Sequence, residues 1–327
     1  MESKLIKPIA INGRFGYIDN EGKLAKKPFY KYVEEFKEDL SVVMNVKSKG
    51  DKSKRIFGYM NRQGEVIYKI GYSSLHEFSE GRACFKRNRK RGFLDKNLDE
   101  VISPIYYHAG NFSEGLASVS TGDKIGYIDR NGKMVIPEMY DHANEFSDGV
   151  AVVKRKKEFH IINKEGETLF RTHLNIRGNS SENLILAYKN VQENGKNICR
   201  FGYINKYGET IIDFKYESAH SFSEGIAPVR MNGKWGYIDK DENTIIDFKY
   251  DSAYSFSEGM ARVGLKKEVS LWKDELDYRY GYIDRNGNEV TKIEYKHLLD
   301  YKNGYGVIMD DMDNTILVDK EGNKISF

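Results

Sequence analysis

The stretch NGKWGYIDKDENTIIDFKYDSAYSFSEG, residues 232–259, contains the pattern that decides the fold of this chain. Looser copies read TGDKIGYIDRNGKMVIPEMYDHANEFSDG at 121–149 and ICRFGYINKYGETIIDFKYESAHSFSEG at 198–225. Similarity that recurs at a fixed spacing is typical of repeat architectures and outweighs local propensity. We therefore interpret the 327 residues as one array of similar units.

Two anchor positions set the phase of the array. One is a strand glycine, and the other is an aromatic residue that follows it by 20 residues in seven copies. The glycines are Gly16, Gly58, Gly92, Gly126, Gly202, Gly236 and Gly281, and the aromatic residues are Phe36, Phe78, Phe112, Phe146, Phe222, Phe256 and Tyr301. An eighth copy has His160 instead of glycine and closes at Leu184 after a four-residue insertion. The basic period is 34 residues, and partial copies at the ends bring the number of units to nine.

These anchors predict a single array over residues 1–327, with partial caps at 1–35 and 301–327. The repeats between the caps lie at about 36–77, 78–111, 112–145, 146–183, 184–221, 222–255 and 256–300. Within one unit we expect three antiparallel strands, for example LASVS at 116–120, KIGYID at 124–129 and KMVIP at 133–137.

The turn between the second and third strands begins with Asp or Asn in all nine copies. These residues are Asp19, Asn61, Asp95, Asp129, Asn163, Asn205, Asp239, Asp284 and Asp319, and Gly follows three residues later in seven of them. An Asx side chain can accept hydrogen bonds from the turn backbone, and glycine takes the left-handed conformation easily. We therefore interpret these carboxylates as turn formers and not as catalytic groups. The anchor glycine inside the second strand indicates a bulge or a close backbone approach.

Composition limits the class of protein. Aromatic residues make up 13 % of the chain and Pro only 5 positions, which favours strands. Charged residues reach 31 %, but the net charge is only +3, so bulk charge does not indicate a nucleic-acid binder. Two cysteines, Cys84 and Cys199, and no apolar run long enough for a signal peptide or a membrane span lead us to expect a cytoplasmic protein without a membrane contact.

The motif GKWGYID, the turn after it, and the segments TII, YDSA and FSEG resemble the WG repeat, also called the KWG repeat, of bacterial proteins. The resemblance covers about residues 5–327, although Trp235-Gly236 is the only literal Trp-Gly pair. It implies an all-β stack that works as a binding or interaction module, in some cases in bacterial conflict systems. It implies no catalytic residues.

The loop between the first and second strands varies most in length. It is longer between Val43 and Gly58, between about Ala187 and Gly202, and between Val263 and Gly281. The last insertion contains Trp272, an aromatic residue outside any repeat position, which is either a contact anchor or a cover for a neighbouring core.

The same loops concentrate basic residues, which we expect along one edge of the array. The candidate partner-binding residues are Lys47, Lys49, Lys52, Lys54, Arg55, Arg87, Arg89, Lys90, Arg91, Arg155, Lys156, Lys157, Lys266 and Lys267, together with Trp272. We expect an acidic edge on the other side, formed by Glu80, Glu114, Asp148, Glu224 and Glu258. A basic edge attracts phosphates or an acidic protein surface, but a lysine-rich edge also serves simply to prevent aggregation between strands.

No pattern of catalytic, nucleotide-binding or metal-ligating residues stands out, and the seven histidines follow the repeat more than a ligand spacing. The sequence therefore predicts an all-β open twisted solenoid of three-stranded meanders, with a closed β-propeller as the alternative. The leading function is a non-catalytic scaffold for a protein partner, without a cofactor. The alternatives are electrostatic binding of nucleic acid or another polyanion and, third, an enzyme with an unrecognised site. The sequence does not fix the oligomeric state.

Overall fold

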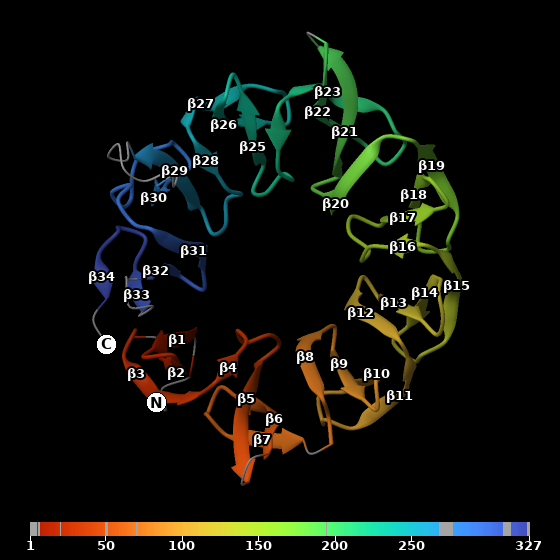
Figure 1. Ribbon diagram of the computed structural model, residues 1–327, viewed down its shortest axis with the longest axis vertical. Coiled ribbons are helices and arrows are strands. Elements are labelled where there is room, and N and C mark those ends of the chain that lie inside the picture. Colours follow the sequence, from red (N-terminus) through yellow and green to blue (C-terminus); the bar gives the residue numbers. More distant parts are fainter. Residues whose placement is uncertain are drawn as a thin grey trace. The chain divides into compact units, whose positions relative to one another are not determined.

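The computed structural model describes residues 5, 7–19, 21–49, 52–69, 71–193, 195–267, 277–309 and 315–325. These residues form nine antiparallel sheets, which we call blades 1 to 9 in chain order. The chain divides into two compact units, one made of residues 1–169 with residue 327 and the other of residues 170–326. Figure 1 labels the strands of each blade.

The first unit contains blades 1 to 4 and most of blade 5. Its strands are, in blade 1, β1 (Lys7–Ile11), β2 (Arg14–Ile18) and β3 (Leu24–Tyr30); in blade 2, β4 (Tyr32–Val33), β5 (Leu40–Lys49), β6 (Lys52–Asn61) and β7 (Val66–Lys69); in blade 3, β8 (Ser74–Ser79), β9 (Arg82–Arg87), β10 (Lys90–Leu94) and β11 (Glu100–Tyr106); in blade 4, β12 (His108–Ser113), β13 (Leu116–Ser120), β14 (Ile125–Asp129) and β15 (Met134–Tyr140); and in blade 5, β16 (His142–Ala143), β17 (Ala151–Arg155), β18 (Glu158–Ile162) and β19 (Thr168–Thr172).

The second unit contains blades 6 to 9. Its strands are, in blade 6, β20 (Asn175–Ser181), β21 (Leu184–Glu193), β22 (Lys196–Ile204) and β23 (Thr210–Tyr216); in blade 7, β24 (Ser218–Ala219), β25 (Ile226–Met231), β26 (Lys234–Asp239) and β27 (Thr244–Tyr250); in blade 8, β28 (Ser252–Ala253), β29 (Ala261–Lys267) and β30 (Asp277–Ile283); and in blade 9, β31 (His297–Lys302), β32 (Tyr305–Met309), β33 (Thr315–Val318) and β34 (Lys324–Ile325).

The predicted open solenoid of three-stranded meanders is wrong. Seven of the nine described sheets have four strands, and the four-stranded antiparallel meander is the blade of a β-propeller. The missed strand is the first one in blades 2 to 9. In blades 2, 5, 7 and 8 it is only two residues long (β4, β16, β24 and β28), too short for an alternating pattern to reveal it. In blades 3, 4, 6 and 9 it is longer, but its pairing with the next strand shifts register, which interrupts the alternation (β8, β12, β20 and β31).

The turn chemistry predicted from the sequence is confirmed. In blade 4, the Oδ1 atom of Asp129 accepts hydrogen bonds from the N–H groups of Asn131 and Lys133, at 2.9 Å each. Gly132 has a φ of 83°, and the other six turn glycines also have positive φ angles. Two copies have Leu98 and Glu242 there instead, at φ angles of 65° and 67°.

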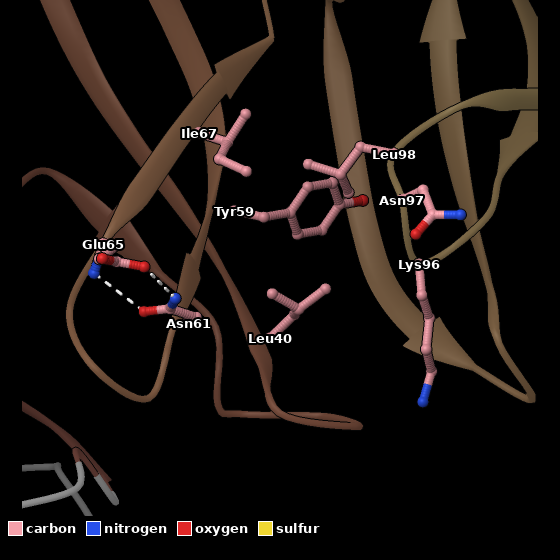
Figure 2. A pocket seen from close by; sticks show the side chains of 8 residues that line it. All are labelled: Leu40, Tyr59, Asn61, Glu65, Ile67, Lys96, Asn97 and Leu98. Carbon is pink, nitrogen blue, oxygen red and sulfur yellow. Dashed lines mark hydrogen bonds between the residues drawn. The ribbon is translucent and has the colours of Figure 1, made fainter.

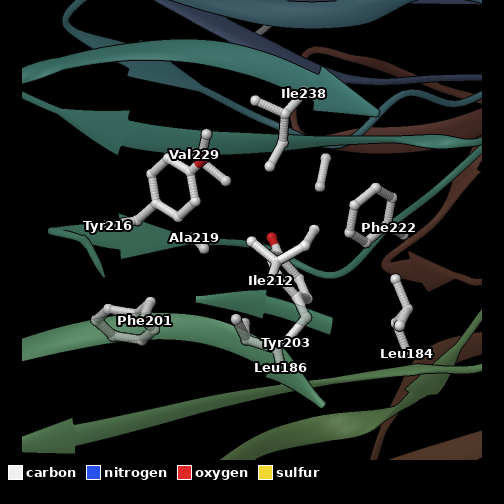
Figure 3. Packing of buried hydrophobic residues seen from close by; sticks show 11 residues of the cluster. Leu184, Leu186, Phe201, Tyr203, Ile212, Tyr216, Ala219, Phe222, Val229 and Ile238 are labelled. Atoms are coloured by element: carbon white, nitrogen blue, oxygen red, sulfur yellow. The ribbon is translucent and has the colours of Figure 1, made fainter. Parts of the chain in front are cut away.

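The core lies between successive blades. In the cluster of Figure 3, Tyr203 and Ile212 of blade 6 pack with Phe222 and Val229 of blade 7. The ring centroids of Tyr203 and Phe222 are 4.9 Å apart in an edge-to-face arrangement, and the Tyr203 hydroxyl donates to the backbone oxygen of His220 at 2.6 Å. The repeated tyrosine therefore joins neighbouring blades through both its ring and its hydroxyl group.

The anchor glycine allows a close approach of the outer strand. A Cβ atom built on Gly126 in β14 would lie 2.4 Å from the backbone oxygen of Ile136 in β15. The pairing of these strands also shifts register twice, so that the seven residues of β15 face a shorter stretch of β14. The close-approach prediction is confirmed, because the bulged outer strand occupies the space that a side chain would need.

We expect Gly126→Ala to lower the free energy of unfolding by about 1–3 kcal/mol, because the backbone of β15 has to move away from the new methyl group. Urea denaturation measures the effect. Gly122→Ala in the neighbouring loop is the matched control, since its added Cβ meets nothing within 4 Å and its φ is not positive. Equal stability of the two variants would contradict the proposed constraint.

Candidate partner-binding surface

The basic residues predicted to bind a partner lie in the hairpins between the second and third strands of blades 2, 3, 5 and 8. Successive connections of a meander alternate between the two edges of a sheet, so each of these hairpins lies on the edge opposite to the Asx turn of its own blade. Lys47, Lys54 and Arg55 of blade 2 are exposed. For Lys49 and Lys52 the structure describes only that their backbones pair, and Trp272 lies outside the described residues.

Blade 3 uses most of its basic residues for contacts inside the protein. Arg87 forms an ion pair with Glu100, and the Nη2–Oε2 distance is 2.8 Å. Lys90 Nζ lies 2.9 Å from the ring centroid of Tyr107. Arg91 Nη1 is 3.0 Å from His76 Nε2 and 3.7 Å from Cys84 Sγ. Of the four predicted residues in this blade, only Arg89 is exposed, and the other three are partly buried.

The tips of blades 5 and 8 keep their basic side chains in solvent. Arg155, Lys156 and Lys157 are exposed, as are Lys266 and Lys267. The backbone N–H groups of these tips donate hydrogen bonds to aspartates that lie just before the first strand of the same blade. The N–H of Lys156 donates to Asp141 Oδ2 at 2.5 Å, and the N–H of Lys266 donates to Asp251 Oδ2 at 2.9 Å.

The expected acidic edge is wrong, because four of its five carboxylates, those of Glu80, Glu114, Glu224 and Glu258, join neighbouring blades. Glu80 of blade 3 accepts a hydrogen bond from the N–H of Gly115 in blade 4 at 2.8 Å and forms an ion pair with Arg130 Nη2 at 2.8 Å. The φ of Glu80 is 52° and that of Gly81 is 73°, so this turn has the type I′ geometry that suits a two-residue hairpin. We call this contact the glutamate latch.

The latch recurs within both units. In each case the glutamate accepts from the N–H of the glycine that ends the corresponding turn of the next blade; the pairs are Glu38–Gly81, Glu80–Gly115, Glu114–Gly149, Glu182–Gly225, Glu224–Gly259 and Glu258–Gly304. Five of them also face a cation next to the Asx turn; these ion pairs are Lys96–Glu38, Arg130–Glu80, Lys164–Glu114, Lys240–Glu182 and Arg285–Glu224. Both signs of charge therefore cancel on this edge of the blades.

We expect Glu80→Gln to remove a pH-dependent part of the stability. Partial burial alone would raise the pKa of Glu80, but the hydrogen bonds from Arg130 and from Gly115 outweigh it, so the pKa lies below its usual value of 4.5. A carboxyl group with a lowered folded-state pKa stabilises the protein above pH 4.5, and this contribution disappears as the pH falls through the folded-state pKa.

The free energy of unfolding of the wild type should therefore exceed that of Glu80→Gln by about 1 kcal/mol at pH 7, and the difference should shrink as the pH falls below 4.5. Thermal unfolding followed by circular dichroism at several pH values measures it. Glu165→Gln changes the same charge at an exposed turn and is the control. A pH-independent difference between wild type and Glu80→Gln would refute the latch.

Blade 2 departs from the repeat at its outer strand. The fourth residue after the turn glycine position (Leu98 in blade 3, Gly132 in blade 4) is Ile102 in blade 3 and Ile136 in blade 4. Ile136 is only 1 % exposed. A Cβ atom built on Gly166 of blade 5 would lie 3.2 Å from Cγ2 of Ile136, so this isoleucine packs on the turn of the next blade. In blade 2 the equivalent residue is Tyr68, and it is 42 % exposed.

The substitution at Tyr68 in blade 2 is accompanied by a second substitution, Leu98 for glycine, in the turn of blade 3. A tyrosine is larger than the isoleucine it replaces, and β7 pairs with β6 one residue to one, without the register shifts found in β3, β11, β15, β23 and β27. Tyr68 therefore lies opposite Gly58 and points outwards. The turn of blade 3 has Leu98 in place of glycine, and its buried side chain packs with Tyr59 and Leu75 in the space that the isoleucine would fill.

A cavity of about 220 Å³ remains at this junction, lined by Leu40, Tyr59, Asn61, Glu65, Ile67, Lys96, Asn97 and Leu98. Figure 2 shows the ring of Tyr59 reaching from blade 2 towards Leu98 of blade 3. Asn61 and Glu65 bond to one another at its rim, where Asn61 Nδ2 donates to Glu65 Oε2 at 2.7 Å.

A second and more open cavity lies on the other side of β7. It measures about 390 Å³ and is lined by Phe29, Asn45, Val46, Lys47, Ile56 and Tyr68. Four of these six side chains are apolar, Phe29 is 58 % exposed, and the only charged one is Lys47. We call this cavity the blade 2 groove. Sequence analysis found its Lys47 but missed Phe29, Val46, Ile56 and Tyr68, since the absence of a bulge, which exposes Tyr68, is not visible in the sequence.

The described residues contain no group of three or more His, Cys, Asp and Glu side chains that could hold a metal ion. Both cysteines are free thiols; Cys84 is buried, and burial raises its pKa above the ordinary value. Among the same residues, no helix has the length and apolar character needed to cross a bilayer.

Comparison with known proteins identifies the family. The model of the WG containing repeat matches residues 15–45, 57–90, 92–124, 125–158, 201–235, 235–267 and 280–311. No curated protein sequence matches the chain. The chain belongs to the WG-repeat family, as the resemblance predicted, and its repeats form a propeller scaffold that fits a non-catalytic binding role.

The fold also resembles solved structures. A eukaryotic initiation factor is similar over 100 % of this chain and 96 % of its own, with 10 % sequence identity and a TM-score of 0.64. The β-propeller domain of the Trilobed protease from Pyrococcus furiosus is similar over 91 % of this chain and 96 % of its own, with 11 % identity and a TM-score of 0.45. At such low identity, the likeness to the initiation factor concerns the fold alone. Together with the four-stranded blades, this likeness identifies the fold as a propeller and not as the predicted open solenoid.

We expect Leu98→Gly and Tyr68→Ile to be coupled, because together they restore the contact found at other junctions. Leu98→Gly alone should cost about 2 kcal/mol or more, since it removes a buried side chain. In the double variant, Ile at position 68 can pack on the glycine and should recover about 1–2 kcal/mol. Urea denaturation of the two single variants and the double variant measures the coupling, and strictly additive effects would contradict our account of blade 2.

Proposed function

We propose that this protein is a non-catalytic scaffold that binds a protein partner through the hairpins between the second and third strands of its blades. The observation that supports this most directly is the uneven use of basic residues. Each latch combines its glutamate with backbone donors and, in five cases, a cation of the next blade, whereas Lys54, Arg89 and Lys156 point into solvent from three different hairpins. These exposed charges are therefore available to an acidic partner.

The variable lengths of these hairpins support the same proposal. Strands β5 and β6 remain paired from Leu40↔Asn61 out to Lys49↔Lys52, and β21 and β22 from Ile185↔Ile204 out to Glu193↔Lys196. Insertions that form paired ribbons present side chains on a rigid element, which lowers the entropic cost of binding. A setting in bacterial conflict systems, which the family resemblance implies, is part of this proposal.

Electrostatic binding of nucleic acid or another polyanion is the second candidate. The exposed run of Arg155, Lys156 and Lys157 favours it, because a cluster of cations attracts phosphate groups irrespective of their sequence. The blade 2 groove favours the protein partner, because four of its six lining side chains are apolar and only Lys47 could pair with a phosphate.

Affinity capture from a lysate of the source organism tests the two candidates. The tagged wild type and a Lys54→Glu, Arg89→Glu, Lys156→Glu variant are compared at low and at high salt, with and without nuclease treatment. We expect the wild type to retain a discrete protein at high salt and the triple variant to retain at least tenfold less.

A Lys133→Glu variant is the control, because this exposed lysine lies beside the Asx turn on the opposite edge of blade 4. Retention of nothing but nuclease-sensitive material that high salt removes would overturn the protein-partner proposal and favour the polyanion.

A further inference from the structure

The outer strand of blade 2 is an unusually open strand edge. β7 ends the sheet of blade 2 and pairs with β6 through four consecutive residue pairs without a register shift. The outer strands β3, β11, β15, β23 and β27 all contain register shifts in their pairing. Bulges and prolines at outer strands discourage the addition of another strand, and β7 has neither.

The position opposite the anchor glycine shows the difference most clearly. A Cβ atom built on Gly16 or on Gly92 would lie 2.8 Å from the backbone nitrogen of Pro28 or of Pro104. Tyr68 lies opposite Gly58 in blade 2. Proline has no N–H to offer to an added strand, whereas tyrosine has one.

The N–H and C=O groups of Tyr68 point away from β6. The N–H of Asn61 donates to the oxygen of Glu65 at 3.0 Å, which makes this pair a hydrogen-bonded one. Hydrogen-bonded and non-hydrogen-bonded pairs alternate along an antiparallel ladder, so Tyr59↔Ile67 is hydrogen-bonded while Gly58↔Tyr68 is not. The backbone groups of Tyr68 therefore face the free edge of the sheet.

The blade 2 groove lies beside this edge, because Tyr68 belongs both to β7 and to the wall of the groove. Its volume of about 390 Å³ can hold a large apolar side chain. The charges around it are basic. Lys47 lines the groove, Lys54 pairs with Lys47 across the hairpin, and Lys27 and Lys31 are exposed on either side of Phe29.

We propose that β7 and the blade 2 groove bind an extended, acidic peptide segment of a partner protein, which adds as a strand to β7. One large apolar side chain of the segment fills the groove between Phe29 and Tyr68. Its Asp or Glu residues face Lys47 and Lys54. Backbone hydrogen bonds supply affinity in this mode of recognition, and the groove and the lysines supply specificity. The inference rests on the proposed scaffold function and names the class of partner for one of its surfaces.

A phage-displayed library of random linear peptides tests the inference on the full chain. We expect the selected sequences to combine an aromatic or large aliphatic residue with neighbouring Asp or Glu residues. A fluorescein-labelled peptide of the most enriched sequence is then titrated against the variants by fluorescence anisotropy. Tyr68→Pro should weaken binding at least tenfold, because it introduces the residue that blades 1 and 3 have at this edge and removes no hydrogen bond to β6.

Lys47→Glu provides a second variant that leaves the strand edge intact. It should also weaken binding at least tenfold, and high salt should reduce the affinity of the wild type. Lys133→Glu, the same charge reversal beside the exposed Asx turn of blade 4, should leave the affinity unchanged. Circular dichroism of each variant establishes that it is folded.

Other outcomes overturn the inference. They are selected peptides without acidic residues, peptides that bind Tyr68→Pro and Lys47→Glu like the wild type, or displacement of the peptide by a single-stranded oligonucleotide at equimolar concentration. The absence of any enriched peptide overturns it as well. If a partner captured from the lysate still withstands high salt in these cases, the scaffold function stands and its contact lies on another hairpin.

Discussion

The close approach between the anchor glycine of the third strand and the backbone of the outer strand is the contact on which the blades depend. A Cβ atom on Gly16, Gly92 or Gly126 would lie within 2.3–2.4 Å of a backbone oxygen. With no side chain in the way, the outer strand bulges over the glycine and folds seven residues onto a shorter stretch of its neighbour. The bulge determines which outer-strand residues face the next blade. In blade 4 it places Ile136 against the turn at Gly166 of blade 5.

Much of this could be predicted from the sequence, because it depends on local chemistry. The Asx turns, the left-handed glycines and the close approach at the anchor glycine follow from what single residues can do, and the structure has them where the repeat places them. The first strand of blades 2 to 9 could not be predicted. In blades 2, 5, 7 and 8 it is two residues long (β4, β16, β24 and β28), and in the others a register shift interrupts its alternating pattern. Without that strand the unit looks like a three-stranded meander, and this led to the prediction of an open solenoid in place of a propeller.

The charged residues show a second limit of sequence reasoning. Acidic and basic residues recur at fixed repeat positions, so they suggested two edges of opposite charge. In the structure Glu80 receives a backbone N–H and an arginine from the next blade, and Glu114 receives the corresponding N–H and a lysine. The sequence contains the residues of both partners, but their distance along the chain is 35 residues or more. A charge pattern therefore shows which residues are polar at a repeat position and not which of them are satisfied there.

The candidate binding surface depends on a departure from the rule that builds the blades. Where Tyr68 takes the place of the packed isoleucine, the outer strand has no bulge and its edge is regular, and Leu98 of the next blade fills part of the space while a cavity of about 220 Å³ remains. A chance substitution at one position would leave a void, because nothing would replace the lost isoleucine. Here two residues in different blades depart from the repeat in a complementary way: Leu98 is buried at the junction, and Tyr68 is exposed on the outer strand of blade 2. Blade 2 therefore breaks the repeat while Leu98 keeps part of the junction packed, and this is why we place the proposed peptide site at this blade.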